Sequence, residues 1–353
     1  MENFIQFQAE LLNWYRRNKR NLPWRKTTNP YNIWISEAML QQTQVRTVIP
    51  YYHKFLKEFP AVEDLAGADQ QKVLKIWEGL GYYSRARNLH KAAKIIAEQH
   101  AGRLPSQAER LRKLPGIGDY IAAAVLSIAF QQPVAVVDGN VKRVLARLFC
   151  LPEPVNDSKN KKSFSVKAGR LLNKNFPGDH NQAMMELGAL ICTPKNPNCD
   201  ICPVCRFCSA FQNKVVADYP KKITKAKTPL YHIAIGVIYK DGKMLITKRR
   251  ENGLLGGLWE FPGGKRRLKE SAEAACIREI KEETGLSVSI VKYLKTVKHA
   301  YTHFKISMDV FICDYVSGEV ELKGPVDHRW IIKDEIPDFP FPKSNHKFMG
   351  LLE

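Results

Sequence analysis

The chain has 353 residues, which is enough for two domains of ordinary size, each with its own apolar core. Its 55 Lys and Arg outnumber 35 Asp and Glu, and the net charge of +20 predicts a polyanionic partner, either a nucleic acid or an anionic surface. Hydrophobic residues make up 44% of the chain, which excludes a disordered basic tail as the source of this charge. No apolar run is long enough to span a bilayer, and the amphipathic start lacks a secretory-signal pattern, so we expect an intracellular protein with no membrane partner.

Helical periodicity dominates the first hundred residues. Asn29 and Pro30 form a favourable helix start, and the residues 22–25 before them are expected to be extended. The predicted helices cover residues 4–15, 31–43, 50–59, 69–79 and 84–100.

A carboxylate lies on the apolar stripe of the helix predicted over residues 31–43, where Ile33, Glu37 and Leu40 share one face. If Glu37 lines a cleft, desolvation raises its pKa and lets it carry a proton near neutral pH, as a general acid must. The alternative is a glutamate at the edge of the stripe that reaches water, and the stripe alone favours that alternative.

The run WEGLGYYSRAR at residues 77–87 places glycines and aromatic residues beside arginines. Such a turn can push a side chain into a base stack while guanidinium groups hold phosphates. Tyr82 is the candidate for this insertion, whereas for Tyr83 packing in the core is an equally good interpretation.

Two helices joined by LPGIG at residues 114–118 form the centre of the first half. Ser106 is expected to cap the first helix and Pro115 to end it, and the second helix is predicted over residues 119–130. Gly116 and Gly118 allow backbone angles and close approaches that a Cβ would forbid. Amides at the start of the second helix would then form a phosphate site. An ordinary helix turn is the alternative, and a lone Gly-x-Gly favours it.

Asp138 follows the apolar run at residues 134–137 and precedes a helix predicted over residues 141–149. It suits a plain N-cap, and the helix dipole would also keep its carboxylate ionised to stabilise a nearby positive charge. A protonated Glu37 and an anionic Asp138 would form a pair with separated pKa values, as in glycosidic bond cleavage.

Cys192, Cys199, Cys202 and Cys208 follow a helix predicted over residues 183–191, with the spacing x6-x2-x5. Four thiolates from one loop can hold zinc, but this spacing is much more specific for an iron–sulfur cluster. Cys205 lies outside the spacing and is expected to be spare. The other cysteines, Cys150, Cys276 and Cys313, are expected to be buried.

The hairpin, Asp138 and the cysteine loop together resemble the helix-hairpin-helix DNA glycosylases of the endonuclease III superfamily. Within it, SEAMLQQTQV around Glu37, WEGLGYYSRARNLHKAA and VDGNV are similar to the MutY adenine glycosylases, over most of residues 1–210. The resemblance implies an all-α domain with a [4Fe–4S] loop, acting on duplex DNA that holds adenine opposite 8-oxoguanine or guanine.

The resemblance also implies roles for single residues. Glu37 would protonate N7 of a flipped adenine, and Asp138 would stabilise the oxocarbenium-like sugar until water arrives. Bifunctional members have lysine at the position of Tyr120, so tyrosine there implies a monofunctional enzyme. The other residues implied are Tyr120 and Asn140 as orienting groups, Arg25 and Gln182 at the base pocket, and Gln41, Gln42 and Tyr82 around the lesion.

A polar, basic stretch bracketed by prolines separates this half from a run of predicted strands. The strands are predicted over residues 231–239, 243–248, 288–298, 302–315 and 328–332. We therefore expect a glycosylase domain at 1–215 with its cysteine loop at 192–208, a linker at 216–229, and an α+β domain at 230–353.

The second domain carries a complete Nudix box that begins at Gly264. In a Nudix hydrolase, the acids at Glu279, Glu282 and Glu283 lie on a helix and bind magnesium at a diphosphate. MutY proteins carry a Nudix-like domain whose box is commonly degraded and which recognises 8-oxoguanine instead. The intact box departs from this pattern. We expect it to support the fold, and magnesium is implied only if the box is active.

The run KHAYTHF at residues 298–304 resembles the lesion-reading loop of the family, which usually has Phe-Ser-His where this chain has Tyr301, Thr302 and His303. Thr302 keeps a hydroxyl that can bond the lesion, although its methyl group alters the geometry.

The leading hypothesis is a monofunctional adenine glycosylase of base excision repair, in a bacterial cytoplasm. We expect a monomer, because one lesion offers no two-fold symmetry, and the linker is a candidate docking segment for unidentified protein partners. The alternatives are an endonuclease III-like glycosylase and lyase for oxidised pyrimidines, a DNA-binding module without catalysis, and a protein that also hydrolyses oxidised nucleoside triphosphates.

Overall fold

The structure is a computed structural model that describes residues 2–224 and 227–352. Its chain divides into two compact units: a helical unit, Met1–Ala66 with Lys91–Lys225, and a C-terminal unit, Gly67–His90 with Ala226–Glu353. The segment Gly67–His90 thus packs with the C-terminal residues. Across the described residues, the helices are too short or too polar to cross a bilayer.

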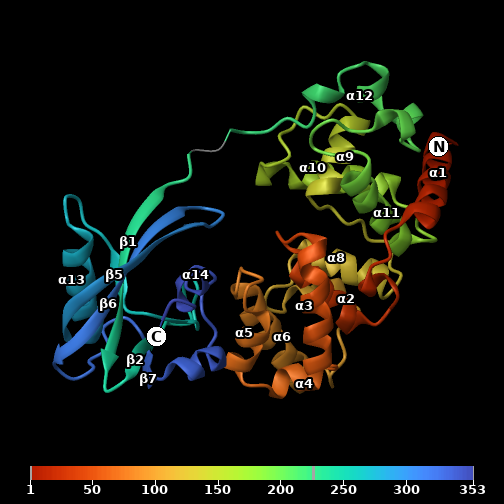
Figure 1. Ribbon diagram of the computed structural model, residues 1–353. Coiled ribbons are helices and arrows are strands. Elements are labelled where there is room, and N and C mark those ends of the chain that lie inside the picture. The colour runs from red at the N-terminus through yellow and green to blue at the C-terminus, as the bar shows by residue number, and fades with distance from the viewer. Residues whose placement is uncertain (1, 225–226, 353) are drawn as a thin grey trace. The chain divides into compact units, whose positions relative to one another are not determined.

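Turns and longer irregular segments join the α-helices of the helical unit, which run from red to green in Figure 1. The core of this unit lies where α1, α9, α10 and α11 meet, with Phe7, Leu145, Phe164 and Leu187 buried. The helices are α1 (Glu2–Asn18), α2 (Pro30–Leu40), α3 (Val45–Glu58), α4 (Val62–Gly67), α6 (Ser84–Gln99), α7 (Ala108–Arg112), α8 (Asp119–Ile128), α9 (Gly139–Leu148), α10 (Lys161–Leu171), α11 (Pro177–Leu190) and α12 (Ser209–Gln212).

Two predicted helix starts are confirmed by their caps. Asn29 caps α2, where its side chain accepts a 2.8 Å hydrogen bond from the main-chain N–H of Tyr31. Asp138 caps α9, where it accepts a 2.7 Å bond from the N–H of Val141. Both residues fill the role that short polar side chains take at helix starts.

Other local predictions are wrong in detail. Ser106 does not cap a helix: α7 begins after Gln107, and the carbonyl of Ser106 accepts a 2.7 Å bond from Gln132 Nε2 instead. Residues 22–25 are not fully extended, because Pro23–Arg25 forms a 3-10 turn. The helix predicted over residues 31–43 corresponds to α2, which ends earlier, at Leu40.

The C-terminal unit is built on a seven-stranded mixed sheet in the order β3-β2-β1-β6-β5, with β4 paired to β1 and β7 to β2. Strands β1 and β6 are parallel, and the other pairs are antiparallel. The strands are β1 (Leu230–Lys240), β2 (Lys243–Lys248), β3 (Trp259–Glu260), β4 (Gly263–Lys265), β5 (Ser287–Ala300), β6 (Lys305–Ser317) and β7 (Asp327–Ile331).

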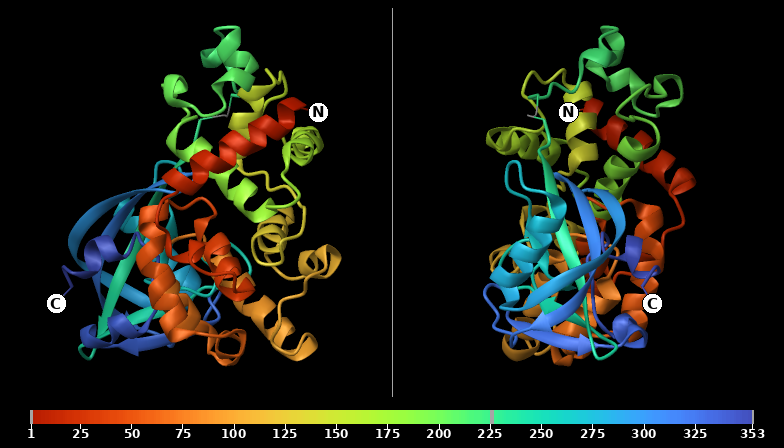
Figure 2. Two further views of the ribbon diagram at one scale, coloured as in Figure 1. Left: turned by 90° about the vertical axis from the view of Figure 1, so that its right-hand side faces the viewer. Right: turned by 60° about the vertical axis from the view of Figure 1, so that its left-hand side comes forward.

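Helices cover both faces of this sheet, as Figure 1 shows, and its twist can be followed in Figure 2. On one face, α13 (Ala272–Thr284) buries Cys276 and Ile280 against Phe311. On the other, the C-terminal segment with α14 (His346–Met349) buries Phe341 and Phe348. The unit also contains α5 (Gln70–Trp77) and the first residues of α6.

The strand pattern was predicted with two errors. The strands β3 and β4 were missed, because two or three residues are too few to show alternation. Thr302 does not begin a strand: residues 301–304 form a turn in which the N–H of Tyr301 donates to the carbonyl of Phe304 at 2.8 Å, and β6 begins at Lys305. Among the cysteines expected to be buried, Cys276 and Cys313 are buried and Cys150 is only half-buried.

The start of the predicted linker is attached to the helical unit. Arg147 Nε donates to the carbonyl of Tyr219 at 3.0 Å. The side-chain amide of Asn156 bonds both the N–H and the carbonyl of Ile223, each at 2.9 Å. The linker prediction also covers residues 225–226, which lie outside the described residues.

Candidate active site

A cavity of about 200 Å³, here called the Glu37 cavity, opens in the helical unit. Its walls come from the turn at Pro23–Arg25 and from α2, α8, α9 and α11. The residues predicted for the catalytic site and base pocket all line it: Arg25, Glu37, Tyr120, Asp138, Asn140 and Gln182. The fold thus brings together side chains that are far apart in the sequence.

Glu37 projects from α2 into this cavity and is only 4% exposed. Burial raises its pKa to about 7, although the phenol of Tyr120 donates a 2.5 Å hydrogen bond to Oε2 and favours the anion. The charge of Asp138 raises the pKa further. The interpretation of Glu37 as a solvent-reaching residue is therefore wrong, and the carboxyl carries a proton in a large share of molecules at neutral pH.

Asp138 is held differently, although it is also buried. Burial is the largest effect and leaves its pKa raised, although several donors favour its anion. The N–H of Val141 donates to Oδ1 at 2.7 Å, and the side-chain amide of Asn140 donates to Oδ2 at 3.0 Å. Arg143 lowers the pKa as well. One cavity therefore holds a carboxyl that favours its proton and a carboxylate surrounded by donors.

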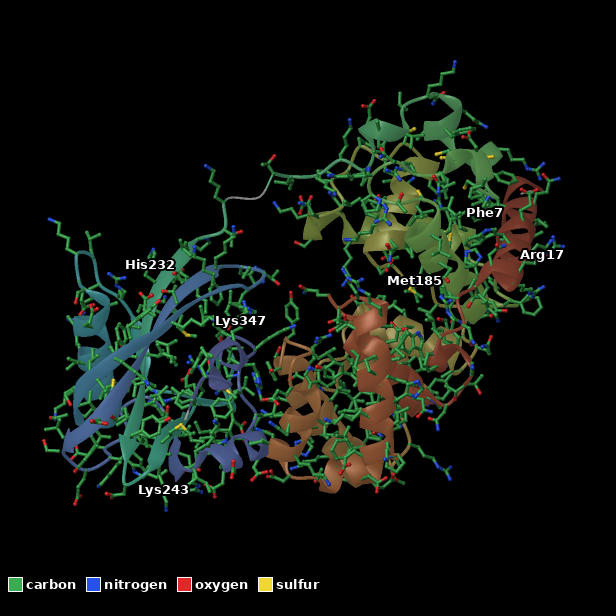
Figure 3. The ribbon with its side chains drawn as sticks, in the orientation of Figure 1. Phe7, Arg17, Met185, His232, Lys243 and Lys347 are labelled. Carbon is green, nitrogen blue, oxygen red and sulfur yellow. The ribbon has the colours of Figure 1, made fainter. Side chains whose placement is uncertain are left out.

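The sequence analysis missed Glu186, which lies on the same cavity wall. Its side chain is fully buried, and Arg20 and Arg25 each bond both of its oxygens at 2.6–2.9 Å. Burial alone would raise its pKa, but these hydrogen bonds lower it to about 2. Glu186 follows Gln182 by four residues in an apolar helix, so the argument applied to Glu37 would have found it. Its neighbour Met185, labelled in Figure 3, lies with Sδ 3.7 Å from the hydroxyl of Tyr120.

The hairpin between α7 and α8 has the predicted position, but its two glycines differ. Gly116 has φ of +78°, which favours glycine. Gly118 has φ of −83°, and no atom lies within 4 Å of the place where its Cβ would be. The expectation that backbone geometry requires glycine at 118 is therefore wrong, and the missing side chain leaves space before the first amides of α8. Asp119 begins that helix and pairs with Arg112 and Lys161.

A second cavity, of about 380 Å³ and here called the Thr302 cavity, lies within the C-terminal unit. The predicted lesion-reading residues Tyr82, Tyr301, Thr302 and His303 line it. The hydroxyls of Tyr82 and Thr302 share a hydrogen bond, and Tyr82 has a positive φ of +50°. Of the described residues that line this cavity, none is acidic. Tyr83 is only 4% exposed, which supports its interpretation as a core residue.

The predicted residues Gln41 and Gln42 follow α2 directly and line neither cavity. Gln42 is exposed and has φ of +57°. They lie between Leu40 and Thr43, which do line the Glu37 cavity.

Polar groups surround the sulfur atoms of the four predicted cluster ligands. Burial, followed by the charge of Cys192, raises the pKa of Cys199, and burial raises that of Cys202 to about 12. Arg147 Nη1 lies 3.3 Å from Cys192 Sγ, and main-chain N–H groups bond the sulfurs of Cys202 and Cys208. These donors favour thiolates, and the four mutually repelling sulfurs suit a cationic iron centre.

The described residues contain no three His, Cys, Asp or Glu side chains placed to hold one metal ion.

The acids of the Nudix box lie on or before α13, where Arg278 holds three of them. Arg278 bonds Glu270 at 2.7 and 2.8 Å, Glu279 at 2.8 Å and Glu282 at 3.0 Å. Glu283 accepts the N–H of Gly263 at 3.1 Å, and burial raises its pKa to about 7. Three of these acids therefore accept hydrogen bonds in an ion-pair network around Arg278.

Comparison with protein families assigns both halves of the chain. Residues 35–168 match the HhH-GPD superfamily of base excision DNA repair proteins. Residues 234–351 match the NUDIX domain. These matches confirm the predicted fold class of a helical helix-hairpin-helix unit followed by a Nudix-like unit.

Two relatives that match most of this chain have the same name. Adenine DNA glycosylase of Mus musculus is 35% identical over 402 residues, covering 98% of this chain and 78% of that protein. The same-named protein of Arabidopsis thaliana is 36% identical over 367 residues, covering 88% of this chain and 58% of that protein. The solved structure of a thermostable thymine-DNA glycosylase is 30% identical in sequence and has a TM-score of 0.56. The match covers 60% of this chain and 98% of that chain. The chain belongs to the adenine DNA glycosylase family.

Proposed function

We propose that this chain hydrolyses the N-glycosidic bond of adenine opposite 8-oxoguanine, or opposite guanine, in duplex DNA. The products are free adenine and an abasic site in an intact strand. The observation that carries the proposal is that Glu37, with a pKa of about 7, and the N-capped Asp138 share one nucleobase-sized cavity.

The chemistry follows from the different environments of the two acids. Protonated Glu37 donates its proton to N7 of the extruded adenine, so the base leaves as a neutral molecule when the C1′–N9 bond breaks. The sugar becomes an oxocarbenium-like cation, which the negative charge of Asp138 stabilises. Water then adds to C1′ and releases a proton, which completes the hydrolysis.

The residues around these two acids support recognition of adenine and a single activity. Gln182 and Arg25 line the cavity where the base would lie, and Asn140 holds Asp138. Strand cleavage through a Schiff base needs an amine at the reacting sugar. Of the described residues that line the Glu37 cavity, none is a lysine, and the hydroxyl of Tyr120 donates a hydrogen bond to Glu37. This lining favours a monofunctional enzyme over a lyase.

The Thr302 cavity is the proposed site for the base opposite adenine. Tyr82, Tyr301, Thr302 and His303 give it aromatic walls and hydroxyl or ring N–H groups, which suit a base with an added oxygen. The net charge of +20 and the open space at Gly118 support binding of the DNA backbone. We further propose that the chain acts as a monomer on one lesion.

Cys192, Cys199, Cys202 and Cys208 are the proposed ligands of a [4Fe–4S] cluster. The cluster would supply a structural cross-link for the loop between α11 and α12. Iron and sulfide analysis of the purified chain and of Cys199→Ser tests this assignment. We expect about four irons per chain in the first sample and a large loss in the second.

A single-turnover assay tests the main proposal. Duplexes with adenine opposite 8-oxoguanine, adenine opposite guanine, or thymine glycol are incubated with an excess of the full chain, and each sample is divided for treatment with alkali. We expect adenine release from the first two duplexes, with strand breaks only after alkali. Breaks without alkali, or activity on thymine glycol alone, favour the endonuclease III-like alternative.

The Nudix-like unit is proposed to recognise the lesion without hydrolysing nucleotides, and the ion pairs of Arg278 with three box acids support this role. The full chain is incubated with magnesium and 8-oxo-dGTP, and pyrophosphate is measured. Release above that of a Glu282→Gln variant would contradict the proposal.

A further inference from the structure

The residues that lead to Asp138 have no regular secondary structure from 131 to 138. Main-chain N–H and C=O groups inside a protein need partners, and such a segment has no helix or sheet to supply them. The N–H groups of Gln132 and Val134 bond main-chain carbonyls at 2.9 and 2.7 Å, whereas the N–H of Val136, closer to Asp138, bonds a side chain. The conformation of this segment decides where Asp138 lies.

One side chain from α11 bonds this segment at two points. Asn181 is 2% exposed, and its Oδ1 accepts the N–H of Val136 at 3.0 Å. Its Nδ2 donates to the carbonyl of Val134 at 2.8 Å. The amide thus pairs with the extended residues as a neighbouring strand would. Val136, whose N–H bonds Oδ1 of Asn181, lies two positions before Asp138.

The helix that carries Asn181 is itself packed closely against α8 and α9. A Cβ at Gly178 would lie 2.8 Å from the carbonyl oxygen of Ser127 at the end of α8. A Cβ at Gly188 would lie 2.6 Å from Cβ of Asn140 in α9. Both glycines permit close approaches, so α11 is a fixed frame from which Asn181 can hold the segment.

We infer that Asn181 is a positioning residue for glycosidic bond hydrolysis, because its amide fixes the segment that keeps Asp138 on its N-cap donors and at the Glu37 cavity. The inference rests on the proposed function, since Asp138 has no reaction to serve otherwise. Asn181 does not line the Glu37 cavity, so it acts through the main chain and not on the substrate.

The expected consequence of losing this amide follows from the hydrogen bonds. The N–H of Val136 and the carbonyl of Val134 would lack their partners, and the segment would rearrange to satisfy them. Asp138 would then move away from the N–H of Val141, which favours its anion, and its pKa would rise.

The other titratable groups near Asp138 come from three helices: Glu37 on α2, Tyr120 on α8 and Arg143 on α9. Arg20, Arg25 and Glu186 form their own ion pairs on the cavity wall. The side-chain hydrogen bonds of Asn181 go to the segment before Asp138, so replacing Asn181 removes no hydrogen bond to these groups.

The test uses the full chain with Asn181→Ala and Asn181→Asp. Single-turnover adenine release is measured from about pH 5 to pH 9 on a duplex with adenine opposite 8-oxoguanine. We expect a fall of about 100-fold at pH 7, as for a displaced catalytic group. The acid limb of the profile should move to higher pH, whereas the basic limb, set by Glu37, should stay. Affinity for a duplex with a hydrolysis-resistant 2′-fluoro adenosine should stay close to that of the unmodified chain.

Asn156 provides a matched control. Its amide makes the same two-point contact with the N–H and carbonyl of Ile223, each at 2.9 Å, but at an exposed position outside the Glu37 cavity. Asn156→Ala removes two hydrogen bonds of the same kind and should leave the pH profile unchanged. Thermal unfolding of all variants shows which of them are folded.

The outcomes separate the inference from the proposed function. If the unmodified chain releases no adenine, the proposed function fails before any variant is compared. If folded Asn181→Ala keeps the rate and the acid limb of the unmodified chain, the positioning role is overturned. Should Asn181→Ala fail to fold, Asn181→Asp decides: it keeps the acceptor for Val136 but loses the donor to Val134, and an unmoved acid limb overturns the inference.

Discussion

The hydroxyl of Tyr120 donates a 2.5 Å hydrogen bond to Oε2 of Glu37, and this bond opposes the effect of burial on the carboxyl. Tyr120→Phe removes a contact that favours the anion, so the pKa of Glu37 should rise. Glu37 must be protonated to act, and the basic limb of the pH–rate profile should therefore move to higher pH. Single-turnover rates across the basic range measure this shift, and a limb that stays in place would show that the bond does not tune the acid.

Replacing Glu37 with Gln should abolish most of the activity and increase stability at alkaline pH. Loss of a general acid lowers rates by about 10²–10⁴. The pKa of Glu37 is about 7 in the fold against an ordinary 4.5, so the folded state loses stability as pH rises between these values. Above pH 7 the uncharged variant should be more stable by roughly 3 kcal/mol, with little difference at the acid end of the range.

Denaturant unfolding of Glu37→Gln and of the unmodified chain at both ends of this pH range checks the stability prediction. Tyr120→Phe provides a control, because it changes the same contact but keeps the carboxyl. Equal stabilities at alkaline pH would mean that Glu37 is not held protonated by its surroundings.

The shared hydrogen bond of Tyr82 and Thr302 predicts how the C-terminal unit distinguishes lesions. Thr302→Val keeps the shape of the side chain and removes its hydroxyl. We expect a reduced preference for adenine opposite 8-oxoguanine over adenine opposite guanine, measured as the ratio of single-turnover rates at limiting enzyme. Thr302→Ser restores the hydroxyl and should restore the preference. Equal rate ratios for Thr302→Val and Thr302→Ser would show that the hydroxyl of Thr302 takes no part in lesion recognition.

Basic side chains beside the Thr302 cavity predict a phosphate contact. Lys343 lines the cavity together with His299, and Lys347 donates to the carbonyl of Lys298 at 2.6 Å. Lys343→Gln should weaken binding of the lesion duplex and reduce the slope of log Kd against log salt by about 0.9, the value for one phosphate.

The control for Lys343→Gln is Lys243→Gln, at the first residue of β2. Figure 3 labels Lys243 at one end of the C-terminal unit, far from the labelled Lys347. Its neutralisation should leave the salt slope unchanged. Equal effects of the two variants would indicate a general loss of charge instead of a phosphate contact.

Short-range patterns predicted much of the site. Asp138 was identified as an N-cap from its position before a helix, which is a property of neighbouring residues. The apolar stripe alone favoured a solvent-reaching Glu37, and its catalytic role was implied by the resemblance of the surrounding motif. Asn181 was missed because its role depends on a segment far along the chain, near Val136. Glu186 was open to the argument applied to Glu37, but its pairing with Arg20 and Arg25 joins residues far apart in the sequence.

The grouping of Gly67–His90 with the C-terminal residues could not be seen in the sequence for the same reason. Its contacts include the carbonyl of Gly256, which accepts from Arg87 at 2.6 Å, and the N–H of Phe341, which donates to Glu78 at 2.7 Å. Main-chain groups are nearly the same in all residue types, so the contacts that they make cannot be recognised from the sequence. The predictions for the turns at Ser106 and Thr302 were wrong because the alternative conformations of these turns differ by only a few hydrogen bonds.

Arg278 gives the acids of the Nudix box a structural role. Its guanidinium bonds Glu270 in the turn before α13 and also Glu279 and Glu282 on that helix, so it holds the turn and the helix together. Selection for a well-folded domain can therefore preserve Arg278 and the three acids that it bonds. A genome survey that searches for the motif alone cannot separate a box kept for turnover from one kept for folding, because the two have the same sequence.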